Sequence, residues 1–215
     1  MSRLNLPPTK STQLRLKHDL GVAEEGFKLL DQKREILVLE LMRMLDKVRR
    51  LQESLDNCKK DAYETLKQAT ARNGFHLMEK LADGIKYEHR VELHTRIVAG
   101  VRLPVVEQEK TEYRMQYSVL DSDSLVDKTS RLYLKLLGVI GEMAEVQSSV
   151  WLLARELKKT QRRVNALEQI FIPDFSDTLN YITETLESKE LEAFSIMKLL
   201  KKNLETANKR QRGAM

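Results

Sequence analysis

The sequence is poor in the residues that form disulfides, tight turns and aromatic cores. Its 215 residues include one cysteine (Cys58), eight glycines and four prolines, and only 6% are aromatic. A single cysteine excludes an internal disulfide and suggests a reducing compartment. Charged residues make up 32% of the chain. A composition rich in leucine, glutamate, lysine and arginine and poor in glycine favours long helices over sheets.

Sequence signals for catalysis and for nucleotide or metal binding are also missing. The chain has no HExxH, CxxC, GxSxG, GxGxxG or GxxxxGK[ST] pattern. The histidines show no metal-ligand spacing, and on a strand His89 and His94 would point to opposite faces. Cys58 falls on an apolar seam, which favours a small core residue over a nucleophile. We therefore expect no enzyme activity, no cofactor and no bound metal.

Long hydrophobic runs are absent as well. The longest, residues 36–45, is interrupted by Glu40 and Arg43 and is about half the ~20 residues that a membrane span needs. The first ten residues lack the apolar core of a signal peptide. The net charge of +5 is modest and spread out, which favours an acidic protein surface over nucleic acid as a partner. We expect a soluble protein that reaches a membrane only through other proteins.

Apolar residues recur at alternating steps of four and three along two long stretches, with Arg34 and Thr160 as polar exceptions. A seven-residue repeat sustained over this length specifies a left-handed coiled coil. The first series consists of Leu16, Leu20, Ala23, Phe27, Leu30, Leu37, Leu41, Met44, Val48, Leu51, Leu55, Cys58 and Ala62. The second consists of Leu132, Leu136, Val139, Met143, Val146, Val150, Leu153, Leu157, Val164 and Leu167.

The second repeat is disturbed after Leu167, where the apolar steps become three successive fours. Such a stutter locally unwinds a supercoil. Pro173 lies inside it, lacks a backbone donor and disfavours helix at Ile172. We expect the helix to be kinked there, or broken and restarted. Beyond this point the apolar stripe resumes toward Ile196 and Leu200.

A different pattern separates the two repeats. Apolar and polar residues alternate across residues 90–107, on both sides of Ala99-Gly100. Alternation of period two around a glycine-containing turn predicts a β-hairpin, and Pro104 confines its strand to an edge. Because an isolated hairpin is only marginally stable, we expect it to pack on the helices or on a partner.

These patterns predict an all-α fold, a long antiparallel two-helix coiled coil with a short β-hairpin insertion in the connecting region. The predicted segments are an N-terminal helix (1–75), a connecting region with the hairpin (76–125), a C-terminal helix kinked near Pro173 (126–207) and a frayed tail (208–215). If the second helix folds back about Gly100, residue n faces roughly residue 200−n.

Two features exceed what a plain coiled coil explains. Residues 34–45 and 190–202 are apolar on more sides than one partner helix can cover, so a third surface is expected to enclose them. In the register above, two basic clusters also lie at one level and form a collar that suits an acidic ring, although a solvated charged face is the simpler interpretation. The clusters are Arg43, Lys47, Arg49 and Arg50, and Arg155, Lys158, Lys159, Arg162 and Arg163.

Three segments together resemble one known family. They are PTKSTQLRLKHDLGVAEEGFKLLDQKREIL (8–37), AGVRLP (99–104) and, most specifically, RRVNALEQIFIP (162–173). All three resemble the D subunit of V-type and A-type ATPases and ATP synthases, in its shorter prokaryotic form. The resemblance extends, in the right order, over nearly the whole chain and is loose in residues 108–130 and after Thr206.

The resemblance implies a non-catalytic central rotor axle. Such an axle transmits torque between ATP hydrolysis or synthesis in the catalytic head and translocation of protons or sodium ions in the membrane rotor. The implied partners are the catalytic and regulatory head subunits, the small F subunit of the stalk and a funnel-shaped subunit that links to the membrane rotor. The implied location is cytoplasmic, on the inner face of the membrane, in a peripheral complex without nucleic acid and without direct membrane insertion.

The resemblance also implies which residues meet these partners. The residues expected to contact the head ring are Arg34, Arg43, Arg162, Arg163, Ile170, Ile172, Pro173, Phe194 and Met197. Those expected to contact the stalk partners are Val98, Gly100, Val101 and Pro104 of the hairpin. Two alternatives remain beside this interpretation: a self-associating basic coiled-coil scaffold, and a module that binds nucleic acid or an anionic membrane.

Overall fold

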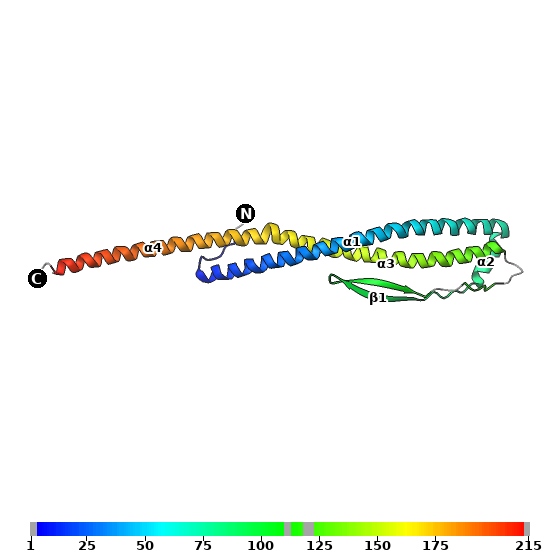
Figure 1. Cartoon of the computed structure of the whole chain (residues 1–215), viewed down its shortest axis with the longest axis horizontal. Coiled ribbons are helices and arrows are strands. Elements are labelled where there is room, and N and C mark those ends of the chain that lie inside the picture. The colour runs from blue at the N-terminus through cyan, green and yellow to red at the C-terminus, as the bar shows by residue number, and fades with distance from the viewer. Residues whose placement is uncertain (1–3, 110–112, 118–122, 213–215) are drawn as a thin grey trace. The chain divides into compact units, whose positions relative to one another are not determined.

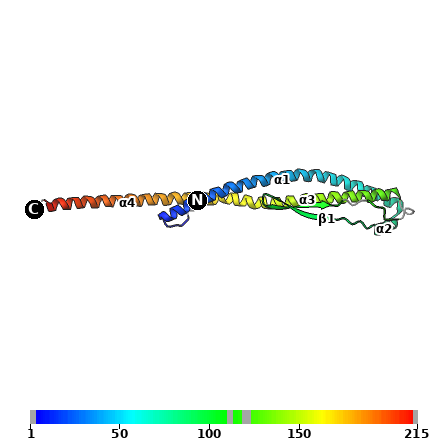
Figure 2. The same ribbon diagram turned by 60° about the horizontal axis from the view of Figure 1, so that its bottom comes forward.

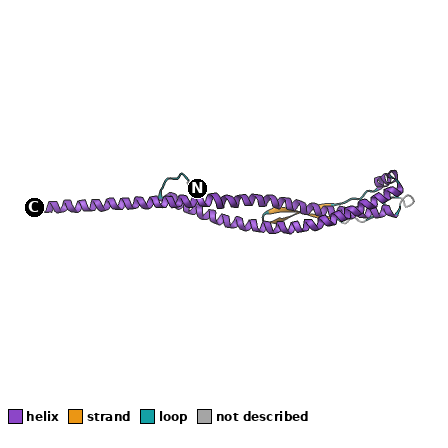
Figure 3. Ribbon diagram, turned by 90° about the horizontal axis from the view of Figure 1, so that it is seen from above, coloured by secondary structure: helices purple, strands orange, loops and turns teal. Residues whose placement is uncertain are grey.

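The structure, a computed structural model, describes residues 4–109, 113–117 and 123–212. Its elements are α1 (Lys10–Asn73), α2 (Phe75–Gly84), β1 (Val91–Val98), β2 (Val101–Gln108), α3 (Ser124–Ala166), the π-helix η2 (Leu167–Phe171) and α4 (Ile172–Arg212). Helices dominate, and the two strands form the one sheet of the described residues (Figure 1; Figure 3). The predicted all-α coiled coil with a small β insertion is confirmed.

The first long helix has well-defined signals at both ends. Thr9 precedes α1, and its hydroxyl accepts a hydrogen bond of 3.2 Å from the Thr12 N–H, which satisfies one of the free donors of the first turn. The helix ends at Asn73, because Gly74 adopts a positive φ of 79° and its N–H still donates to the Thr70 carbonyl at 2.9 Å. Between these residues the 64-residue helix is uninterrupted.

The chain forms two compact units. One unit combines Met1–Gln32 with Thr160–Met215. Its described contacts join the start of α1 to α4, with Gln13 Nε2 2.8 Å from Thr183 Oγ1 and Lys10 Nζ 4.0 Å from Glu190 Oε1. The residue number rises from Lys10 to Gln13 along α1, while that of the partner on α4 falls from Glu190 to Thr183, so the two helices run antiparallel. The side chains buried in this unit are Leu16, Ala23, Thr160, Val164, Thr178 and Ile182.

The second unit, Lys33–Lys159, contains the rest of α1, most of α3, α2 and the hairpin. Lys33 Nζ lies 3.0 Å from Glu156 Oε1, and Arg72 Nε lies 3.0 Å from Asp123 Oδ2. These pairs place α1 and α3 side by side and antiparallel in this unit (Figure 2). The core at the hairpin consists of Leu37, Leu103 and Leu153, which are 0%, 1% and 0% exposed.

The predicted helix register is wrong by several residues in this second unit. A 200−n rule pairs Lys33 with residue 167, whereas its partner is Glu156. Between Arg72 and Lys33 the first helix advances 39 residues (72−33), while its partners advance 33 (156−123). Figure 2 shows α1 arched over α3, so α1 uses more residues for the same span. Symmetry about Gly100 could not anticipate this difference.

The stutter produces a π-helix and no break. In η2 the backbone hydrogen bonds span five residues where an α-helix spans four, and the Ile172 N–H donates to the Leu167 carbonyl five residues earlier. Ile172 is helical, with φ −63° and ψ −48°, although Pro173 follows it. The prediction that Pro173 disfavours helix at Ile172 is therefore wrong. The extra residue of the π turn takes up the stutter, and Pro173, which has no backbone donor, lies directly after this turn.

The β-hairpin forms where the alternation predicted it. Its antiparallel register pairs Val98 with Val101 and Thr95 with Pro104. The two turn residues, Ala99 and Gly100, have φ values of 49° and 80°. Two successive positive φ values define a type I′ turn, whose twist matches that of the flanking strands.

The elements differ from the predicted segments in two places. The connecting region contains a ten-residue helix, α2, which the sequence interpretation did not anticipate. At the other end α4 continues to Arg212, past the predicted limit at residue 207, because neither proline nor glycine occurs before Gly213. The rest of the predicted frayed tail, residues 213–215, lies outside the described residues.

By length and composition alone, the helical region Ser124–Asn203 includes a stretch apolar enough to cross a membrane. Core helices of soluble proteins meet the same criterion. The expectation that the chain does not insert directly into a membrane stays a prediction.

Candidate interaction surfaces

The last part of α4 exposes a dense apolar surface. Every residue from 187 to 203 is exposed. The apolar stripe predicted toward Ile196 and Leu200 is present but is not paired with α1: these side chains are 58% and 55% exposed, because the pairing with α1 reaches only Glu190. The apolar end of α4 comprises Leu191, Phe194, Ile196, Met197, Leu199 and Leu200.

A second apolar surface lies on α1. Leu37 is fully buried, whereas its neighbours Ile36, Leu39 and Met42 are 52%, 67% and 59% exposed. The surplus apolarity predicted for residues 34–45 is thus present and is not covered by the described part of the chain. Groups of exposed large apolar side chains mark interaction sites more often than isolated ones do.

The basic residues predicted to contact a head ring are mostly exposed. Arg162 and Arg163 lie exposed near the end of α3, followed by Ile170, which is 54% exposed. Ile172 and Pro173 are half-buried. The segment 162–173 thus offers cationic groups and, about two helical turns later, one exposed isoleucine.

The remaining two predicted contact arginines differ from each other. Arg34 is half-buried, and Arg43 is exposed with Nη1 3.8 Å from Glu40 Oε2 of its own helix. The predicted collar does not form within the second unit. Lys47 lies 4.0 Å from Glu145, and Glu156 lies beside Lys33, so Arg155, Lys158 and Lys159 are level with the region of Lys33. The collar is therefore wrong, and the cause is the same shift of register.

The hairpin residues predicted to contact stalk partners are only partly available. Val98 and Val101 pack against the core of Leu37, Leu103 and Leu153, while Gly100 is exposed and Pro104 is half-buried. The open apolar surface of the hairpin is on β1 instead, where Val91, Leu93 and Ile97 are 48%, 71% and 68% exposed. Alternation in the sequence showed these residues as apolar but not that they are left exposed.

Polar contacts among the described residues hold the hairpin to the helices. Arg96 Nη2 donates to Glu40 Oε1 at 3.3 Å, and the Val106 N–H donates to Glu145 Oε2 at 2.9 Å. Gln108 Nε2 donates to the Gly138 carbonyl at 3.2 Å. Gly141 allows this approach, since a Cβ there would overlap the Gln108 amide. Gly141 therefore permits close packing of the hairpin against α3.

Two tyrosines and an aspartate form a compact polar cluster where the connection meets α3. Tyr113 Oη and Tyr117 Oη donate to Asp127 Oδ1 at 2.9 Å and 2.5 Å. Burial, followed by the hydrogen bond to the Asp127 carboxylate, raises the pKa of Tyr117 strongly above its ordinary value of 10.0. The guanidinium of Arg131 lies 4.7 Å from the Tyr113 ring centroid. These contacts fasten the connection to α3.

One apolar pocket lies among α1, α2 and α3 in the second unit. It has a volume of about 470 Å³, and its lining includes Leu66, Met78, Leu81, Tyr133 and Leu137. The sequence interpretation missed this pocket because it missed α2. It also missed Trp151, the single tryptophan, whose side chain is 73% exposed on α3. Tryptophan is common at protein interfaces, so the presence of this residue in the sequence was a signal for one.

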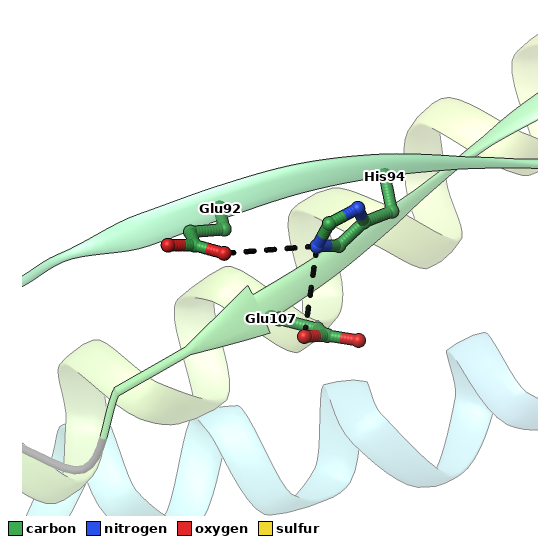
Figure 4. Close-up of side chains that lie close together, drawn as sticks. All are labelled: Glu92, His94 and Glu107. Atoms are coloured by element: carbon green, nitrogen blue, oxygen red, sulfur yellow. Dashed lines mark ion pairs between the residues drawn. The ribbon is translucent and has the colours of Figure 1, made fainter.

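Glu92, His94 and Glu107 converge on one face of the hairpin (Figure 4). His94 Nε2 lies 3.7 Å from Glu92 Oε2 and 3.6 Å from Glu107 Oε2. All three side chains are exposed. Inspection of histidine spacing alone could not find this group, because Glu107 comes from the other strand.

Paired helices with a docked hairpin define an antiparallel coiled-coil protein. The family model for the D subunit of ATP synthases matches residues 12–202. The D subunit of the V-type ATP synthase of Thermotoga neapolitana is 31% identical over 201 residues, which are 94% of this chain and 99% of that protein. A D subunit of the V-type ATP synthase of Treponema pallidum, numbered 2 in that organism, is 37% identical over 196 residues, 91% of this chain and 94% of that protein.

An A-type relative is also similar to this chain. The D subunit of the A-type ATP synthase of Pyrococcus abyssi is 32% identical over 205 residues, which are 94% of this chain and 96% of that protein. The chain therefore belongs to the D-subunit family of ATP synthases, and the resemblance seen in the sequence is confirmed.

Proposed function

We propose that this protein is the central rotor axle of a V/A-type ATP synthase or ATPase. In this role it transmits torque between the nucleotide-dependent head and the ion-translocating membrane rotor, and it makes or breaks no bond of a substrate itself. Its place is on the cytoplasmic side of the membrane, in a peripheral complex. Membership of the D-subunit family supports this assignment.

The observation that carries the proposal is the apolar end of α4. Six large apolar side chains within ten residues are 55–68% exposed, so burying them requires a surface that the described chain does not supply. Burial of each such side chain is worth about 1.5–3 kcal/mol. A sleeve of head subunits around this helix would gain that energy, and Arg162 and Arg163 would face acidic groups on its wall.

Torque transmission also needs an axle that resists twisting. Buried seam residues occur in both units, with Leu16, Val164 and Ile182 in one and Leu37, Val146 and Leu153 in the other. Interdigitated seam residues couple the two helices over many turns, so twisting one helix displaces the other. The hairpin and the pocket at α2 are the proposed surfaces for the small F subunit of the stalk and the funnel-shaped subunit.

The test is reconstitution with the head subunits of the same complex. The double variant Phe194→Ser/Met197→Ser should lower the yield of assembled head, because it removes two of the six apolar side chains. Phe75→Ser is the matched control: Phe75 is 73% exposed but lies on α2, so the head should assemble as with the wild type. Co-purification followed by native mass spectrometry measures the assembled fraction.

A second measurement tests coupling separately from assembly. Arg162→Ala/Arg163→Ala should assemble yet translocate fewer ions per ATP hydrolysed, measured in vesicles that contain the whole complex. The proposal is wrong if the head assembles and couples normally with both double variants. A stable homodimer that persists beside excess head subunits would instead support the self-associating scaffold.

A further inference from the structure

We propose that the β-hairpin binds one divalent transition-metal ion, Zn²⁺ in the first instance, through Glu92, His94 and Glu107. Nothing in the rotor function requires such a site. The ligand atoms of the three residues lie within 4.8 Å of one another, and no other group of this kind occurs among the described residues.

The strand register brings the three ligands together. Glu92 and His94 are two residues apart on β1, so their side chains share one face. Glu107 of β2 is the direct antiparallel partner of Glu92. A nitrogen and two oxygens from two strands therefore lie close together, and Figure 4 shows both carboxylates beside the same ring nitrogen of His94.

The separations are close to those of a metal site. Zinc bonds of about 2.0–2.2 Å to nitrogen and oxygen place tetrahedral ligands about 3.3–3.5 Å apart. The two separations from His94 Nε2, 3.7 Å and 3.6 Å, need to shorten by only a few tenths of an ångström. The carboxylate oxygens of Glu92 and Glu107 lie within 4.8 Å of each other and need to approach by at most about 1.5 Å. Because all three side chains are exposed, they can make this adjustment without disturbing a packed core. Water can supply the fourth ligand.

Electrostatics favours a cation at this point. Like charges directly opposite in an antiparallel pair destabilise it, and Glu92 and Glu107 are opposed in this way. Within the described residues, the ion pairs of both carboxylates are with the single imidazole of His94. A divalent ion would neutralise both carboxylates and would bind the imidazole in its neutral form.

The donor set selects among metals. Imidazole nitrogen suits zinc and its transition-metal neighbours, whereas Mg²⁺ and Ca²⁺ prefer oxygen ligands in larger numbers. Binding would link β1 to β2 near the open end of the hairpin, away from the Ala99-Gly100 turn. The strand ends would then separate less often, which amide hydrogen exchange can detect.

The test uses the full chain and titrates it with ZnCl₂ in a calorimeter. We expect saturation near one ion per chain and slower hydrogen exchange of residues 91–108 in the zinc-bound protein. His94→Gln and Glu107→Gln should each raise the Kd at least about tenfold, since losing even an outer-shell partner costs about 10–100-fold. Co²⁺ should give the visible absorption of a nitrogen- and oxygen-ligated site, and MgCl₂ should give no saturable binding.

The matched control is His76→Gln. His76 is another exposed histidine beside a carboxylate, 3.8 Å from Glu79, but within the part of the chain that the structure describes it has a single such neighbour. Its variant should bind zinc as the wild type does. The proposal is overturned if His94→Gln keeps the wild-type affinity. It is also overturned if light scattering shows that zinc binds only by joining two chains.

Discussion

Truncation of Leu103 tests how the hairpin is held to the coiled coil. Leu103 is the buried residue of the hairpin, 1% exposed, and it inserts between Leu37 of α1 and Leu153 of α3. In Leu103→Ala the hairpin keeps its strands and turn but loses its main apolar contact. The helices lose a side chain that covers Leu37 and Leu153.

The expected magnitude follows from the cavity left behind. Leucine-to-alanine changes in a rigid core cost about 2–5 kcal/mol. Here the hairpin can separate from the helices. The loss of unfolding free energy is then limited to the apolar part of the docking energy, which adds to the Arg96–Glu40 and Val106–Glu145 contacts. Burial of a leucine side chain contributes about 1.5–3 kcal/mol, so we expect a loss of about 2 kcal/mol.

The assay combines urea denaturation, followed by circular dichroism, with hydrogen exchange measured by mass spectrometry. Exchange of residues 91–108 should rise by more than tenfold in Leu103→Ala, because about 1.4 kcal/mol already corresponds to tenfold. The control is Leu93→Ala, which removes the same side chain from β1 at a position that is 71% exposed. Its stability and exchange should stay close to those of the wild type.

A double variant checks that the effect passes through the contact itself. Leu37→Ala and Leu103→Ala should be less costly together than the sum of the single changes, because both remove the same contact. The reasoning is refuted if Leu103→Ala matches Leu93→Ala in both stability and hairpin exchange. In that case the polar contacts alone would hold the hairpin.

Three further predictions concern α3, the tyrosine cluster and the π turn. Gly138→Ala should stabilise the protein by about 0.5–1 kcal/mol in urea denaturation, since nothing lies within 4 Å of the new Cβ. Gly141→Ala should stabilise it less, because the new Cβ displaces the Gln108 side chain. Equal gains in stability would contradict the packing role of Gly141. Because the pKa of Tyr117 is raised in the folded protein, its contribution to stability is present in full below pH 10 and is lost as the pH rises further. Between pH 9 and 11 the urea midpoint of unfolding should therefore fall more steeply for the wild type than for Tyr117→Phe. Parallel plots of midpoint against pH would exclude this role. Pro173→Ala should convert η2 toward regular α-helix, which a crystal structure of the variant would show. An unchanged π turn would mean that the stutter alone causes it.

The heptad pattern predicted the core of the fold well. Leu37, Val146, Leu153 and Val164 belong to the predicted seams, and each is 0–1% exposed. A period of 3.5 residues determines which face of a helix is buried, and the alternation around Ala99-Gly100 likewise determined the hairpin. Local sequence was sufficient for these features because each depends on residues that are close together in the sequence.

Features that depend on how distant segments meet were not predictable. The register around Lys33 and Glu156 depends on the arch of α1, which no periodicity records. The seam pattern at Ile196 continues although no α1 residue faces it, because a stripe indicates that a side is apolar but not that the chain covers it. The group of Glu92, His94 and Glu107 is created by strand pairing, and the spacing of histidines along the sequence contains no trace of it.

The exposed end of α4 has a consequence for how the protein is made. Residues 187–203 extend a helix that is already nucleated, so they can remain helical, yet no neighbouring helix of the described chain braces them. Local opening is easiest where few buried contacts resist it, and proteases cleave such places first. Copies synthesised in excess of their partners would therefore be cleaved first at this end.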